Sequence, residues 1–273
     1  MPKTALRFAR QNPHIVKATR DFISEFTSIV DPVVKVASLA ESEDAQMAWV
    51  LLGSVISQDL SYLELESILL ALFKAFPNKS LWETPVPKAS DLTEVIQKAL
   101  GKESWSLLEQ APGMFWSVGF FVRKHLPLKS WLESRTEEEL WRDLGEIYFM
   151  GKKRVRPKAS SAIYRLKSPP PLGLGLPVKE GDCFLRLPLS MGARRFMAFI
   201  GPGKEGEFSS WTPEKKQTQT NEWFKILSPS MPIQSAHALT FFLEPGQSEY
   251  LCREHFRLCK NCPLFSYCSY GKA

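Results

Sequence analysis

Apolar side chains recur every three or four residues through most of this 273-residue chain, which is the periodicity of α-helices. Residues 45–56 are apolar on nearly all sides, which predicts a buried helix. The pattern resumes over residues 60–73 after the polar turn Ser57-Gln58-Asp59, where Ser57 or Asp59 is suited to cap the second helix. Further helices are predicted at 22–30, 92–100, 158–166 and 232–243. The chain is therefore predicted to be all-α.

Four of the five cysteines form a C-x6-C-x2-C-x5-C pattern near the C-terminus: Cys252, Cys259, Cys262 and Cys268. Four thiolates at such spacings can hold one tetrahedral Zn²⁺ or one 4Fe-4S cluster. Two disulfides are the alternative, but no secretory leader is visible, so we expect an intracellular, reducing compartment. Zinc sites usually show two close cysteine pairs, whereas only Cys259 and Cys262 form one here, so the spacing favours the cluster. Cys183 lies in an apolar stretch and is predicted to be a buried hydrophobic residue.

The charge balance favours a polyanionic partner. The net charge is +6 and the isoelectric point is about 9.0. The densest basic cluster comprises Lys152, Lys153, Arg154, Arg156 and Lys158. If these cations neutralise phosphates, binding should weaken steeply with salt. Residues 1–20 are also basic, which is typical of an arm on nucleic acid or of a solvated terminus. No run of about 18 apolar residues indicates a membrane span.

The cysteine motif, with Pro263 directly after the third cysteine, resembles the motif of the endonuclease III and MutY branch of helix-hairpin-helix DNA glycosylases. The resemblance extends over residues 45–75, 144–200 and 232–268. It implies a structural 4Fe-4S cluster whose loop brings Arg253 and Arg257 to the DNA backbone. Zinc remains the alternative metal.

Three further segments carry the resemblance. The helix before Ser57-Gln58-Asp59 is similar to the family's Leu-Leu-Ser-x-Gln segment, which implies that Gln58 fills the gap left by a flipped base; an ordinary turn residue is the alternative. Lys158-Ala159 matches the Lys-Ala end of a family motif over residues 144–159. Residues 177–196 resemble the helix-hairpin-helix, although Leu189-Ser190 replaces its first glycine. That motif implies phosphate contacts by Ser190, Gly192, Arg194 and Arg195, with an ordinary helical corner as the alternative.

The catalytic positions depart from the family. Bifunctional members have a lysine nucleophile where this chain has Arg194, and a guanidinium stays protonated, so β-lyase activity is not expected. The family's aspartate has no counterpart, and Glu214 is the nearest candidate carboxylate; an exposed glutamate beside two lysines is the alternative. The resemblance implies a monofunctional DNA N-glycosylase that removes a damaged or mispaired base from double-stranded DNA. A catalytically inactive Fe–S DNA-binding protein is the other hypothesis.

The resemblance also implies two helical lobes with a DNA-binding groove between them. By this resemblance, residues 44–202 are expected to form a six-helix-barrel-like domain that contains the hairpin, with 77–135 as an inserted or divergent subregion. Residues 1–43 and 203–273 are expected to form a second helical lobe, which carries the cluster loop at 252–268. We expect a monomer located in the cytoplasm and nucleoid, or in a nucleus.

Overall fold

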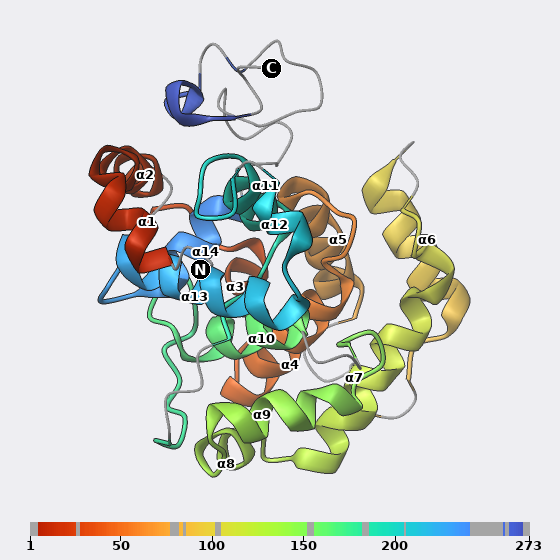
Figure 1. Ribbon diagram of the computed structural model, residues 1–273. Coiled ribbons are helices and arrows are strands. Elements are labelled where there is room, and N and C mark those ends of the chain that lie inside the picture. Colours follow the sequence, from red (N-terminus) through yellow and green to blue (C-terminus); the bar gives the residue numbers. More distant parts are fainter. Residues whose placement is uncertain are drawn as a thin grey trace. The chain divides into compact units, whose positions relative to one another are not determined.

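The computed structural model in Figure 1 describes residues 5–25, 28–76, 82–83, 86–101, 105–151, 156–181, 186–204, 206–240, 259 and 262–269. These residues form helices, turns and loops and contain no strand, which confirms the predicted all-α fold. None of the described helices combines the length and apolar character needed to span a bilayer. The chain divides into two compact units: unit 1 comprises residues 1–29 and 185–273, and unit 2 comprises residues 30–184.

Unit 2 is built around one buried helix, α4 (Glu43–Ile56), which matches the helix predicted at 45–56. Ser42 caps its first turn, accepting a hydrogen bond from the Ala45 amide at 3.2 Å. The other helices of unit 2 are α3 (Pro32–Ala37), α5 (Tyr62–Ala75), α6 (Ala89–Leu100), α7 (Ala111–His125), α8 (Leu128–Glu133), α9 (Glu137–Asp143) and α10 (Pro157–Lys167). Helices α3, α7, α8 and α10 all pack against α4, which leaves it no exposed face.

A buried ion pair ties three elements of unit 2 together. Arg165 of α10 donates from Nε to Asp31 at 3.0 Å and from Nη1 to the Ser54 hydroxyl of α4 at 3.0 Å. The other oxygen of Asp31 caps α3 by accepting from the Val33 amide at 2.9 Å. Because both charges are buried, each depends on the other for compensation.

Residues 77–135 contribute to the same core as the rest of unit 2 rather than to a separate one. Leu92 and Ile96 of α6 and Met114 and Phe115 of α7 belong to the cluster of buried side chains that includes α4. The described part of this segment is therefore packed into the core of unit 2.

Unit 1 contains α1 (Ala5–Gln11), α2 (Pro13–Glu25), α11 (Met191–Phe199), α12 (Glu207–Ser210), α13 (Pro213–Leu227) and α14 (Pro232–Thr240). Its core is centred on α13, where Trp223 and Phe224 are fully buried and Phe8 meets the Trp223 ring edge-on at 5.5 Å. The Ala5 amide also donates to Gln219 Oε1 of α13 at 2.8 Å. Helix α1 therefore packs against α13, more than 200 residues later in the chain.

The boundaries of the units differ from the predicted boundaries at 43/44 and 202/203. Residues 30–43 belong to unit 2, because α3 packs on α4 and Asp31 pairs with Arg165. Residues 185–202 belong to unit 1, because α11 packs on α14.

Candidate functional site

The turn that follows α4 exposes two polar side chains. Gln58 and Asp59 are both exposed, and Asp59 adopts the left-handed conformation with φ 60°. The residues at 105 and 106 hold this turn in place: Trp105 Nε1 donates to the Gln58 carbonyl at 2.8 Å, and the Ser106 hydroxyl donates to Asp59 Oδ2 at 3.3 Å. The backbone beneath the Gln58 side chain is therefore fixed by a partner 47 residues away.

Lys158, in the first turn of α10, supports the same turn from inside unit 2. Its Nζ donates to the Val55 carbonyl at 2.7 Å, which satisfies one of the acceptors left unpaired at the end of α4. Burial lowers the pKa of Lys158 from 10.5 to about 8, and the nearby Asp59 carboxylate opposes the shift. We call Gln58, Asp59 and Lys158 the turn site.

Backbone strain is concentrated beside the turn site. Among the described residues other than glycine, only Asp59 and Phe149 have positive φ, and Phe149 has φ 68°. The Lys158 ammonium lies 5.5 Å from the centre of the Phe149 ring, so both left-handed residues adjoin the same lysine. A bulky aromatic residue rarely adopts this conformation, and such outliers cluster at functional sites. The sequence pattern gave no signal for Trp105, Ser106 or Phe149 as parts of a site.

The predicted phosphate contacts of Arg156 and Lys158 are not supported by their positions. Arg156 Nη1 donates to the Trp141 carbonyl at 3.0 Å and to the Arg142 carbonyl at 3.3 Å, and its guanidinium stacks 4.4 Å from the centre of the Trp141 ring. The Lys158 ammonium donates a hydrogen bond to the Val55 carbonyl. Both cations donate hydrogen bonds to backbone carbonyl groups of their own unit. A count of charges along the sequence does not reveal these contacts. Lys152, Lys153 and Arg154 lie outside the described residues.

The segment predicted to form a helix-hairpin-helix has only its second helix among the described residues. Residues 168–181 and 186–190 are not helical, because prolines and glycines interrupt the chain after α10. Ser190 is the N-cap of α11, and its hydroxyl accepts from the Ala193 amide at 3.1 Å. Cys183 lies outside the described residues.

A close contact between two helices explains the glycine at position 192. A Cβ on Gly192 would collide with the Leu239 carbonyl oxygen, so the glycine lets α11 approach α14 closely.

Arg194 is exposed, whereas Arg195 is half-buried and its guanidinium lies 5.8 Å from the Phe199 ring centre. Of the predicted contacts on this helix, Arg194 has the position best suited to a phosphate.

Glu214 lies on the exposed first turn of α13 in unit 1. Thr212 caps this helix by accepting from the Lys215 amide at 3.2 Å. A carboxylate in the first turn interacts favourably with the helix dipole, so helix stability alone accounts for a glutamate here.

The cysteine segment is described at Cys259, Cys262 and Cys268, whereas Cys252, Arg253 and Arg257 lie outside the described residues. The Cys262 amide donates to the Cys259 carbonyl at 3.1 Å, which closes a tight turn. Burial raises the pKa of the Cys262 thiol, while hydrogen bonds from the Leu264 and Phe265 backbone amides lower it. Burial is the larger effect, so the pKa is raised on balance, and the thiolate that binds metal would need a bound cation to be favoured here.

The donor chemistry of this segment fits a thiolate-bound metal, although its described part does not assemble one. No group of three or more His, Cys, Asp or Glu side chains in the described part of the chain is placed to hold a metal ion. Soft thiolate donors suit zinc or an iron–sulfur cluster. Cys252, the fourth ligand that the resemblance implies, lies outside the described residues.

No model of a known protein family matches this chain, and no curated protein matches it either. The case for its function therefore rests on the residues and contacts described above.

Proposed function

We propose that this chain binds damaged or mispaired double-stranded DNA and acts as a monofunctional DNA N-glycosylase of the helix-hairpin-helix Fe–S class. The observation that carries the proposal is the exposed Gln58 side chain on a turn fixed from two sides, by Lys158 and by Trp105. The family assignment rests on the sequence resemblance.

A fixed turn suits a residue that enters the DNA stack. Extruding a base costs a few kcal/mol, and a side chain that replaces it must not lose much further conformational entropy on binding. Helix α4 is buried on all sides, and its last turn is anchored by Lys158, so the backbone of Gln58 is already ordered. The glutamine amide can both donate and accept, which lets it bond to the base left unpaired in the opposite strand.

Asp59 is the carboxylate that this arrangement places beside Gln58. In N-glycosidic hydrolysis, water adds to C1′ of the sugar, the C1′–N bond breaks with its electron pair leaving on the base, and a carboxylate accepts a proton from the water. We assign that proton to Asp59, whose Oδ2 is oriented by the Ser106 hydroxyl at 3.3 Å. Glu214 remains the second candidate.

The four cysteines, Cys252, Cys259, Cys262 and Cys268, would hold a 4Fe-4S cluster, with Zn²⁺ as the alternative. When bound, the cluster would cross-link the end of the chain without taking part in base removal. The side chains that we propose to contact phosphates are Lys152, Lys153, Arg154, Arg194, Arg195, Arg253 and Arg257. Iron, sulfide and zinc analysis of the purified protein distinguishes the two metals, and Cys262→Ser should lower the content of whichever is present.

The test of activity is a panel of duplexes that carry uracil, oxidised, alkylated or mismatched bases, each assayed with and without alkali. We expect alkali-dependent breaks at one class of lesion, lost in Asp59→Asn and reduced in Gln58→Ala. Asp91→Asn and Gln97→Ala are matched controls, because both residues are exposed on α6 of the same unit. If Glu214→Gln abolishes the breaks and Asp59→Asn does not, the carboxylate is Glu214.

A non-catalytic DNA-binding role is the second candidate, and two observations favour it. Arg194 stands where an amine nucleophile is expected, and Glu214 is exposed on a helix start rather than enclosed in a pocket. If no lesion is cut while the same duplexes are bound with steep salt dependence, the glycosylase proposal fails and the binding role stands.

A further inference from the structure

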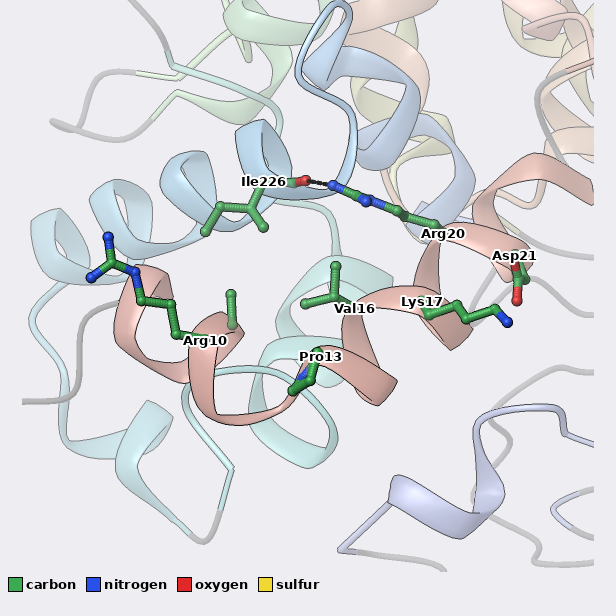
Figure 2. Close-up of a pocket in the computed structure, with 8 residues that line it drawn as sticks. Arg10, Pro13, Val16, Lys17, Arg20, Asp21 and Ile226 are labelled. Atoms are coloured by element: carbon green, nitrogen blue, oxygen red, sulfur yellow. Dashed lines mark hydrogen bonds between the residues drawn. The ribbon is translucent and has the colours of Figure 1, made fainter.

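A groove in unit 1, shown in Figure 2, has an aliphatic floor and a predominantly basic rim that also contains one carboxylate, Asp21. It has a volume of about 390 Å³, within the range of about 300–1,000 Å³ that is usual for ligand pockets. Helices α1 and α2 and the last turn of α13 line this open groove. Its apolar lining comes from Ala9, Pro13, Val16 and Ile226, and its charged lining from Arg10, Lys17, Arg20 and Asp21.

The three cations differ in their availability. Arg20 is used within the unit: it donates from Nη2 to the Ile226 carbonyl at 2.7 Å and from Nε to the Leu227 carbonyl at 3.2 Å, which caps α13. Arg10 and Lys17 are exposed, and no carboxylate among the described residues pairs with either. Figure 2 shows these two side chains at opposite ends of the groove, with Pro13 and Val16 between them.

This combination does not suit nucleic acid. A phosphate seated on the aliphatic floor would lose water without gaining hydrogen bonds, which is costly. A nucleobase would lack a stacking partner, because none of the residues that line the groove is aromatic.

An acidic peptide with an aliphatic anchor suits both parts of the groove. Burying a leucine- or isoleucine-sized side chain on the floor removes apolar surface from water, which is favourable by about 25 cal/mol per Å². Acidic residues on either side of the anchor would meet Arg10 and Lys17, which form no described ion pair and outnumber the one carboxylate that lines the groove, Asp21. We propose that this groove binds an acidic segment of a partner protein through one aliphatic anchor. The proposal is independent of the proposed glycosylase function.

The test selects random peptides displayed on phage against the full-length protein and measures binding of the enriched peptides by fluorescence anisotropy. We expect the enriched peptides to share Leu, Ile or Met with Asp or Glu on both sides. The double variant Arg10→Glu/Lys17→Glu should raise their Kd by about tenfold or more, which corresponds to at least 1.4 kcal/mol. Lys225→Glu is the control, since it reverses an exposed charge on α13 that does not line the groove.

A second variant tests the floor without changing charge. Ala9→Leu should fill the groove and weaken the same peptides, and unchanged melting temperatures show that both variants are folded. Enriched peptides without the acidic and aliphatic pattern, or peptides that bind the double variant as well as the wild type, would overturn the proposal. If no peptide is enriched, the proposal is also overturned, and loss of duplex DNA binding by the double variant would then identify the groove as a DNA contact.

Discussion

Replacing Lys158 by methionine tests whether the buried amine holds the turn that carries Gln58. Methionine keeps most of the side chain's packing against Phe149 but removes the ammonium and its hydrogen bond to Val55. Losing the donor leaves a buried carbonyl unpaired, which costs about 1–3 kcal/mol. Removing the buried charge works in the opposite direction.

The lost hydrogen bond and the removed charge can be told apart by how the free energy of unfolding changes with pH. Burial lowers the pKa of Lys158 from 10.5 to about 8, and each pKa unit is worth about 1.4 kcal/mol, so the protonated lysine destabilises the folded state by about 3 kcal/mol. Between about 8 and 10.5 the folded state has released this proton while the unfolded state still holds it. The Lys158 contribution to the free energy of unfolding therefore rises with pH across this window. Below it, the full cost of burying the charge is present.

The assay is denaturant unfolding of the wild type and Lys158→Met across this pH window. We expect the two proteins to be close in stability at neutral pH, because the lost hydrogen bond and the removed charge offset each other. The wild type should gain about 3 kcal/mol over the variant as pH rises above 10. Lys98→Met, which removes an exposed lysine paired with Glu94, is the control and should show no such trend.

A direct titration makes the test sharper. The Cε signal of ¹³C-labelled Lys158, assigned by its loss in the variant, should titrate near pH 8. A titration near 10.5, or a stability difference that does not change with pH, would refute the claim that this amine is buried at the turn.

Three further substitutions test the packing. Asp31→Ala should lower the free energy of unfolding by about 3–5 kcal/mol in denaturant titrations, because it leaves the buried Arg165 charge without its carboxylate; a loss below 1 kcal/mol would show that the pair is not buried. Burial lowers the pKa of His125, so the unfolded state takes up its proton first and the wild type loses stability as pH falls through 6.5. His125→Phe should flatten this decline in melting temperature. Gly192→Ala should cost about 1–3 kcal/mol by overlap with the Leu239 carbonyl, measured as a lower melting temperature.

Helices were predictable where burial imposes a period on the sequence. The segment at 45–56 has apolar residues on every side, and the structure buries it as α4. The first residue of each helix was less predictable, because any of several consecutive polar residues can act as the N-cap. Either Ser57 or Asp59 was expected to cap the second helix, but Ser61 does so together with Glu64, and Asp59 is left-handed. Ser57, Asp59 and Ser61 are all suitable N-caps by residue type, and the sequence does not show how many residues lie in the turn between α4 and α5.

The division into units depends on contacts that local patterns do not encode. Asp31 comes directly after the helix predicted at 22–30, and the local pattern shows no sign of a distant partner. Its partner, Arg165, lies 134 residues away, and this ion pair places α3 in unit 2. In the same way, Gly192 matches a phosphate-binding motif by sequence, whereas its close neighbour in the fold is the backbone of α14. One glycine thus satisfies a motif and a packing constraint, and the sequence cannot say which one selected it.

The turn site shows why charge density is a poor guide to individual contacts. Five cations between positions 152 and 158 favour a polyanion as a group, but Arg156 and Lys158 each bind carbonyl groups inside unit 2. These contacts give Lys158 a role apart from phosphate binding, because its ammonium donates to the Val55 carbonyl at the end of the helix that leads to Gln58. The cost of holding the charged lysine in a partly buried position is offset by this hydrogen bond, so Lys158 orders the turn with little net effect on stability at neutral pH. An ordered turn is what the proposed role of Gln58 requires.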